Sequence, residues 1–241
     1  MNDGLLFIHA FPLDSSMWTE QGAVFPDAIT PDLPGFGSAP ASGDVMTMHE
    51  AAKRCVAAMD AVGVERAIIC GLSMGGYVAF EMWRSYRNRV SGLIFANTRA
   101  EADDQIGVEK RLALAGRLRD EGSGFLVDAP PPLLSDTAED SLRERVRNMI
   151  AAQPSASIAA ASEGMARRPD STPDLPGISV PVLVVNSTGD ALIPAEATAR
   201  IAEGIPDASL VTIEGAGHLS NLEAPEHFND ALREFASRPE F

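Results

Sequence analysis

Gly71-Leu72-Ser73-Met74-Gly75 follows directly on the apolar run Ala67-Ile68-Ile69-Cys70, and this stretch decides the fold. The run predicts a buried strand and residues 76–86 predict a helix, so Ser73 sits in a sharp turn between them, a nucleophile elbow. Glycine is needed at both ends because side chains at 71 and 75 would collide where strand and helix meet. The turn strains the backbone of Ser73 and exposes its hydroxyl at the C-terminal edge of a sheet, above a helix N-terminus that favours negative charge.

A serine nucleophile requires a base, and the base requires an acid that orients it and stabilises its positive charge. Asp190 lies in a loop behind the strand run at residues 182–186, and His218 lies in a loop behind the strand run at 210–213. Because the carboxyl ends of parallel strands share one edge, we expect these residues on one rim: Ser73 as nucleophile, His218 as base and Asp190 as the orienting acid.

Other acidic residues near these loops have simpler interpretations. Glu214 and Glu223 flank His218 but lie away from the rim position that the acid must take, so Asp190 is the preferred acid. Asp32 opens a Pro-Gly turn, where an aspartate usually binds nearby backbone.

The composition limits the class of partner. The chain has 241 residues, of which 45% are hydrophobic, enough for one large core with an inserted segment. Its formal net charge of −15 argues against nucleic acid and anionic membranes, which need clustered lysine and arginine, and favours a small neutral ester as substrate. No stretch of about 18 apolar residues occurs, and residues 1–4 lack the basic flank of a signal peptide, so we expect a cytoplasmic protein.

The cysteines and the remaining histidines give no sign of a metal site. Cys55 and Cys70 lack metal-ligand spacing and are interpreted as buried free thiols in a reducing compartment. His49 and His227 each stand alone on an expected helix. No metal is therefore predicted.

Strand-like and helix-like segments alternate along most of the chain. Strand patterns occur at residues 5–8, 27–31, 67–70, 90–96, 181–186 and 209–213, and helical patterns near 46–62, 74–86, 195–203 and 225–236. This alternation predicts an α/β fold with a mostly parallel sheet and helices on both faces. Residues 100–175 contain no strand run, so we expect a helical cap there, inserted into a core formed by residues 1–99 and 176–241.

Four motifs carry a family resemblance: Asp32-Leu33-Pro34-Gly35-Phe36-Gly37, residues 71–76, Gly189-Asp190 and Gly215-Ala216-Gly217-His218. With the chain order Ser, Asp, His they resemble the α/β-hydrolase superfamily, and more specifically its small bacterial carboxylesterases and 3-oxoadipate enol-lactonase-like hydrolases. The likeness extends over nearly the whole chain. It implies a hydrolase that needs no cofactor and acts through an acyl-serine intermediate.

The segment His9-Ala10-Phe11-Pro12 resembles the His-Gly-x-Pro oxyanion loop of that superfamily. The resemblance implies that the backbone N–H groups of Phe11 and Met74 form the oxyanion hole, which stabilises the tetrahedral intermediate. Ala10 replaces the usual glycine and would be strained if this position required a positive φ. The isomer of the Phe11-Pro12 bond is left open by the sequence.

These features favour hydrolysis of a carboxylic ester at Ser73, with Phe36, Leu192 and Leu219 as candidates to line the acyl pocket or, equally, as ordinary core. Related hydrolases that attack haloalkanes or epoxides use an aspartate in place of the serine, so Ser73 argues against them. Hydrolysis of an enol-lactone or of a C–C bond stays open on the same triad. A non-catalytic ligand-binding module is a further alternative, although ligand binding alone requires no complete triad.

The resemblance also predicts an exposed sheet edge. Members of the superfamily normally carry an antiparallel hairpin before the oxyanion loop, yet only eight residues precede His9, so that hairpin is expected to be missing. The strand pattern at 27–31 would then lack an outer neighbour and invite pairing in a homodimer. Pro26 and Pro31 would blunt the edge, so a monomer is the alternative.

Overall fold

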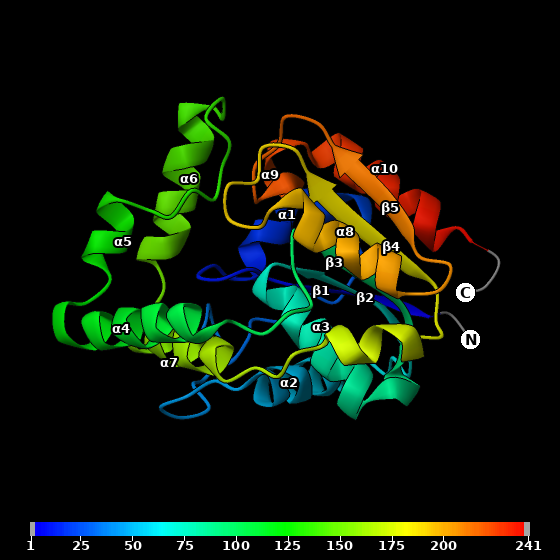
Figure 1. Ribbon diagram of the computed structural model, residues 1–241, viewed down its shortest axis with the longest axis horizontal. Coiled ribbons are helices and arrows are strands. Elements are labelled where there is room, and N and C mark those ends of the chain that lie inside the picture. The colour runs from blue at the N-terminus through cyan, green and yellow to red at the C-terminus, as the bar shows by residue number, and fades with distance from the viewer. Residues whose placement is uncertain (1–2, 239–241) are drawn as a thin grey trace.

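A parallel five-stranded sheet lies at the centre of the computed structural model, which describes residues 3–238 (Figure 1). The strands are ordered β1-β2-β3-β4-β5, and every neighbouring pair is parallel. Their bounds are β1 Gly4–Ile8, β2 Ala67–Leu72, β3 Val90–Ala96, β4 Val182–Ser187 and β5 Ser209–Ile213. The three central strands are buried along their whole length, as their continuous apolar sequences require of parallel strands covered on both faces.

Helices cover both faces of this sheet, as the alternation of sequence patterns predicts. Figure 1 shows α2, α3 and α8 on one face and α1 and α10 on the other. The α-helices are α1 Thr19–Val24, α2 Met48–Ala61, α3 Met74–Ser85, α4 Gln105–Glu121, α5 Gly124–Asp128, α6 Asp140–Ala151, α7 Ser155–Ala166, α8 Ala195–Gly204, α9 Ser220–Glu223 and α10 Pro225–Ala236. Short 3-10 helices are η1 Ser15–Trp18, η2 Arg87–Arg89 and η3 Thr172–Gly177.

The strand predicted at residues 27–31 is reduced to a single bridge. Ile29 pairs with Leu6 of β1 in parallel, through its own N–H to Leu5 and its carbonyl to Phe7. Pro26 and Pro31 flank this bridge and lack the N–H groups that a longer ladder needs. Within residues 3–238 no antiparallel hairpin covers this side of the sheet, as expected.

Residues 100–175 connect β3 to β4 and carry helices α4 to α7. Figure 1 shows these helices grouped at one end of the sheet, where α4 and α7 pack side by side. No strand occurs between Ala96 and Val182, which agrees with the strand-free pattern of that segment. The division into a core of residues 1–99 and 176–241 and a cap of residues 100–175 stays a prediction.

The part of the chain that the structure describes contains no helix long and apolar enough to cross a membrane. Cys55 and Cys70 are both buried and free. Burial raises the pKa of the Cys55 thiol to about 12 and that of Cys70 beyond it, so both stay protonated and unreactive. Nor do the described residues contain a cluster of side chains suited to bind a metal ion.

Candidate active site

Ser73 lies between β2 and α3 in a backbone conformation that residues other than glycine rarely adopt, with φ 57° and ψ −114°. The neighbouring glycines are required by close packing, as predicted. A Cβ on Gly71 would lie 2.1 Å from the carbonyl oxygen of Gly75, and a Cβ on Gly75 would lie 2.2 Å from that of Ile8. The strained turn is therefore held between β1, β2 and α3, and Ser73 is displayed at the C-terminal rim of the sheet.

Asp190 and His218 form a buried pair on the same rim. The His218 Nδ1 lies 2.8 Å from the Asp190 Oδ2, and the two side chains are 2% and 3% exposed, respectively. Two backbone N–H groups, of Leu192 and Ile193, donate to the other carboxylate oxygen at 2.9 and 3.0 Å. Burial opposes ionisation of Asp190, but these hydrogen bonds and the one from His218 outweigh it and lower the pKa of its carboxyl group.

The ionised carboxylate fixes the tautomer of His218. Because an ionised Asp190 can only accept hydrogen bonds, the Nδ1 of His218 must carry the proton of this pair. The neutral ring therefore keeps its Nε2 free as a proton acceptor, as a general base requires.

Asn97 supports this pair, and sequence reasoning gave it no role. It is the first residue after β3, has a φ of 45° and is 1% exposed. Its side-chain amide donates to Asp190 Oδ2 at 3.0 Å and to Ser187 Oγ at 2.6 Å, while Ser220 Oγ donates to its carbonyl at 2.6 Å. A polar residue directly behind a central strand of a parallel sheet is a signal that could have identified it.

The loop behind β1 lies next to Ser73. His9 is fully buried, and its burial lowers the pKa of the imidazole. The neutral ring donates from Nδ1 to the Ala10 carbonyl and accepts the Leu33 N–H at Nε2.

The backbone of this loop leaves two N–H groups free. Ala10 is not among the described residues with positive φ, so the strain that a positive φ would cause is absent. The Phe11-Pro12 bond is cis. Among residues 3–238 neither Phe11 nor Met74 has an acceptor for its backbone N–H, so both groups stay free to bind an oxyanion.

A cavity of about 230 Å³ connects these elements. Residues from the rim of the sheet line one side of it: Phe11, Pro12, Ser73, Tyr77, Arg99, Leu192, Ile193 and His218. Residues of the segment between β3 and β4 line the other side: Arg111, Leu114, Leu126, Pro131, Leu133 and Met165. Ser73 and His218 therefore face the same space, under a mostly apolar roof.

Two of the three predicted pocket residues do not reach this cavity. Leu192 lines it, but Phe36 and Leu219 are fully buried and do not. Phe36 packs edge-on against the ring of His9 at 5.2 Å between centroids. The backbone N–H of Leu219 donates to the Leu133 carbonyl at 2.9 Å, and its side chain belongs to the buried hydrophobic core. The structure supports a packing role for both residues.

Asp32 and Glu223 bind backbone N–H groups of neighbouring loops, and for Asp32 this is the predicted role. Asp32 accepts the N–H groups of Ser15 and Ser38, which closes the loop after His9. Glu223 accepts the N–H groups of Ser135 and Gly217 and so connects the loop before His218 to residue 135. Neither carboxylate contacts His218.

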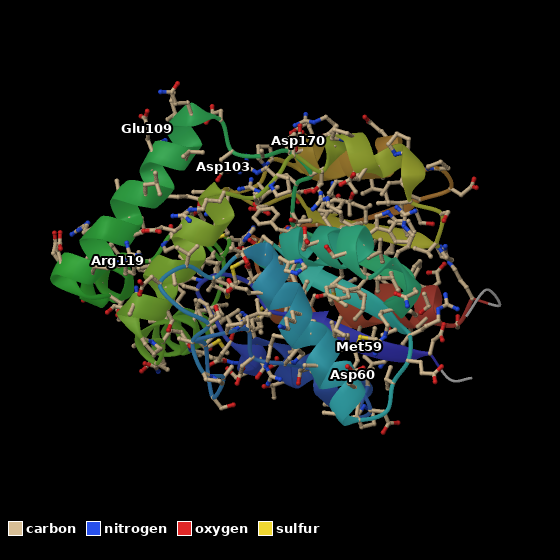
Figure 2. The ribbon with its side chains drawn as sticks, turned by 90° about the horizontal axis from the view of Figure 1, so that it is seen from below. Met59, Asp60, Asp103, Glu109, Arg119 and Asp170 are labelled. Atoms are coloured by element: carbon tan, nitrogen blue, oxygen red, sulfur yellow. The ribbon has the colours of Figure 1, made fainter. Side chains whose placement is uncertain are left out.

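A second buried carboxylate lies outside the lining of the cavity and contacts that lining through Arg111. Asp103 pairs with Arg111 and with Arg168, whose Nη1 lies 2.7 Å from Asp103 Oδ2. Figure 2 shows Asp103 beside the start of α4 and the end of α7. Burial opposes ionisation, but hydrogen bonds from Arg168 and attraction by Arg111 lower the pKa of Asp103 to about 2. The guanidinium of Arg168 also lies over the ring of Tyr77, 4.1 Å from its centroid.

A parallel sheet whose C-terminal rim carries a serine elbow, an aspartate and a histidine has the architecture of α/β hydrolases. A sequence profile of the alpha/beta hydrolase family matches residues 5–231, so this chain belongs to that family.

Its relatives are hydrolases with different substrates. The chain is 26% identical to 3-oxoadipate enol-lactonase 2 of Acinetobacter baylyi, over 97% of this chain and 88% of that protein. A thermophilic esterase from Thermogutta terrifontis is 39% identical, with a TM-score of 0.92 over 97% of this chain and 89% of the esterase. The enol-lactonase from Burkholderia xenovorans is 27% identical, with a TM-score of 0.87 over 99% of this chain and 93% of the lactonase.

Proposed function

We propose that the protein hydrolyses small carboxylic esters through an acyl-serine intermediate. The observation that carries this proposal is the cavity shared by Ser73 and His218, with His218 oriented by the buried carboxylate of Asp190 at 2.8 Å. An activated nucleophile, an oriented base and free backbone donors beside one cavity are the parts that acyl transfer requires.

Ser73 Oγ attacks the ester carbonyl carbon while its proton passes to Nε2 of His218. The N–H groups of Phe11 and Met74 stabilise the resulting oxyanion, and each such donor contributes about 2.7–4 kcal/mol to the transition state. The intermediate collapses, the C–O bond to the alcohol breaks, and the His218 proton is transferred to the leaving alkoxide. A water molecule then attacks the acyl-serine and gives its proton to His218. The acyl C–O bond to Ser73 breaks, His218 returns the proton to Ser73 Oγ, and the carboxylic acid leaves.

The shape of the cavity favours a small acyl group. Its volume of about 230 Å³ lies below the usual range of ligand pockets, roughly 300–1,000 Å³. Leu114, Leu126 and Leu133 close the side opposite the rim of the sheet. We expect activity to fall beyond medium acyl chains.

A fluorophosphonate probe and a series of 4-nitrophenyl esters of increasing acyl length test the proposal. Because the probe reacts only with an activated serine, we expect it to label the wild type and not the Ser73→Ala variant. Ser73→Ala should also lose on the order of 10³- to 10⁶-fold in kcat. Ser38→Ala, which alters an exposed serine outside the cavity, is the matched control. A folded Ser73→Ala protein that keeps most of its ester hydrolysis would disprove the assignment.

Hydrolysis of an enol-lactone is a second candidate, favoured by the similarity to two enol-lactonases over nearly the full chain. A lactone is a cyclic ester, so the same residues would act in the same order. Comparing kcat/KM for an enol-lactone with that for a 4-nitrophenyl ester distinguishes the two. A preference for the lactone of 100-fold or more would make lactone hydrolysis the principal activity, whereas a lower rate on the lactone would exclude it.

A further inference from the structure

Arg99 is an unpaired cation on the wall of the catalytic cavity. It lies behind β3, is partly buried and lines the same cavity as Ser73. Among residues 3–238 its guanidinium makes no hydrogen bond or ion pair, and its Nε is buried without an acceptor. A buried donor without an acceptor lowers the stability of a fold, so such a group requires an explanation.

The backbone on both sides of Arg99 is fixed. Thr98 donates from Oγ1 to the backbone carbonyl of Ser73 at 2.8 Å, and its own carbonyl accepts the hydroxyl of Thr198 at 2.8 Å. On the other side the carbonyl of Ala100 accepts the N–H of Ser171 at 2.9 Å. The loop that carries the guanidinium is therefore held in a constant position relative to Ser73, as a binding group requires.

The second arginine of the cavity and the acids Asp103 and Glu101 form ion pairs, although the Oε2 of Glu101 is buried without a hydrogen-bond partner. Arg111, the second arginine of the cavity, binds Asp103, and Glu101 binds Arg200 at 2.8 Å. No aspartate or glutamate of the described residues lines the cavity itself. Despite the formal net charge of −15, the described residues that line the cavity of Ser73 therefore include two arginines and no carboxylate, whereas Glu101, Asp103 and Asp104 lie in the adjoining hollow.

We propose that Arg99 binds a carboxylate of the substrate, so that the substrate is an acidic ester: a half-ester of a short dicarboxylic acid or a lactone that carries a carboxylate. This inference rests on the proposed hydrolysis at Ser73, and it replaces the expectation of a neutral substrate. A planar guanidinium matches a carboxylate with two parallel hydrogen bonds, and the pair is strong because the donor is partly removed from water.

The position of Arg99 also suits such a substrate. A second hollow, of about 660 Å³, adjoins the cavity and shares Arg99, Arg111, Leu114 and Leu192 with it. Arg99 thus lies where the cavity meets this wider hollow, and the bound carboxylate would stay near solvent while the ester carbonyl reaches Ser73. This arrangement avoids the cost of burying the charged group completely.

Two matched chromogenic esters test the inference. 4-Nitrophenyl hemisuccinate and 4-nitrophenyl butyrate have acyl chains of the same length and differ in a terminal carboxylate against a methyl group. We expect the wild type to show a higher kcat/KM for the hemisuccinate, mainly through a lower KM. The readout is the ratio of the kcat/KM for the hemisuccinate to that for the butyrate. A smaller fraction of active protein lowers both values by the same factor and leaves their ratio unchanged.

Arg99→Gln should lower this ratio about 10- to 100-fold, the loss expected for hydrogen bonds to a charged group. Arg99→Lys should give an intermediate ratio, because it keeps the charge and loses the paired hydrogen bonds. Arg200→Gln, which removes the same charge in the adjoining hollow, is the control and should leave the ratio unchanged.

The outcomes separate this inference from the proposed function. If the wild type hydrolyses both esters and Arg99→Gln keeps the wild-type ratio, carboxylate binding by Arg99 is wrong and ester hydrolysis stands. If Arg200→Gln lowers the ratio as much as Arg99→Gln does, the preference comes from the overall positive charge of this region and not from direct binding by Arg99. That result would overturn the inference. If the wild type hydrolyses neither ester and the fluorophosphonate does not label Ser73, the proposed function itself fails.

Discussion

Asp190 and Asp103 are two buried carboxylates that each pair with a residue lining the cavity, His218 and Arg111 respectively, and they differ in the chemistry of those partners. Asp190 accepts a hydrogen bond from one histidine, whereas Asp103 is paired with two arginines, Arg111 and Arg168. Hydrogen bonds and charge lower the pKa of both carboxyl groups. The difference lies in what the partner can do, because a histidine exchanges protons near neutral pH and an arginine does not.

This comparison separates a proposed catalytic pair from a structural one. A carboxylate beside His218 orients the ring and stabilises the positive charge that forms during each proton transfer. A carboxylate between two permanent cations neutralises charge that is always present, and it joins the start of α4 to the end of α7. Changes at Asp190 should therefore affect rate, and changes at Asp103 should affect stability.

The largest expected effect is the loss of rate in Asp190→Asn. An asparagine would favour the wrong tautomer of His218, so kcat on a 4-nitrophenyl ester should fall about 10⁴-fold. The circular dichroism spectrum should match that of the wild type. A loss of less than tenfold would contradict a role of Asp190 in the reaction rate.

The next effect is the loss of stability in Asp103→Asn. Removing this carboxylate leaves the buried Arg168 without its counter-ion, which should lower the free energy of unfolding by about 3–5 kcal/mol. Asp230→Asn, at an exposed pair with Arg233, should change it by at most about 1 kcal/mol. Urea unfolding at pH 7 measures both values, and equal losses in the two variants would contradict a special role for Asp103.

The same carboxylate predicts a dependence of stability on pH. The pKa of Asp103 is lowered from 3.8 to about 2, so the ionised form is stabilised by folding. Its contribution is fully present above roughly pH 5 and is lost as the pH falls through the folded-state pKa. The stability difference between wild type and Asp103→Asn should therefore be constant from pH 7 to 5 and shrink between pH 4 and 2. Urea titrations of both proteins across this pH range measure the stability difference. A difference that grows as the pH falls would contradict the prediction.

A smaller effect is expected at Ser220, which is connected to Asp190 only through Asn97. Ser220 donates to the carbonyl oxygen of Asn97, which leaves the Asn97 amide group aimed at Asp190. Ser220→Ala removes this hydrogen bond and should lower kcat about 3- to 10-fold, in line with the ordinary net contribution of a hydrogen bond. Ser141→Ala, on the exposed face of α6, should leave kcat unchanged. A loss of kcat in Ser220→Ala as large as that in Asp190→Asn would contradict the view that Asn97 only helps to position Asp190.

The strands and the serine turn at Ser73 could be predicted because their signals are local. A buried strand followed by a glycine-flanked serine fixes both a fold and a site within ten residues, and the five strands lie where the apolar runs predict them. For Phe36 and Leu219 the sequence left the pocket and the core as equal alternatives, because apolar side chains beside motif residues pack into the core as readily as they line a pocket, and the structure buries both.

The contacts that the segment between β3 and β4 makes around the cavity could not be predicted from these local patterns. Arg111 and Arg168 meet Asp103 across 8 and 65 residues of sequence, and no short motif joins them. Arg99 follows β3 closely, but nothing in the sequence indicates that its guanidinium lacks a partner. Such properties depend on how the helices between β3 and β4 pack, which is a matter of three-dimensional contacts.

Asn97 and Thr98 are consecutive residues that contact the two ends of the proposed catalytic triad. Asn97 donates to the carboxylate of Asp190, and Thr98 donates to the backbone carbonyl of Ser73. A thermal displacement of the end of β3 therefore moves the acid and the nucleophile in the same direction. Their separation should fluctuate less than the position of either residue alone, and the alignment of the triad should persist while the rim of the sheet as a whole vibrates.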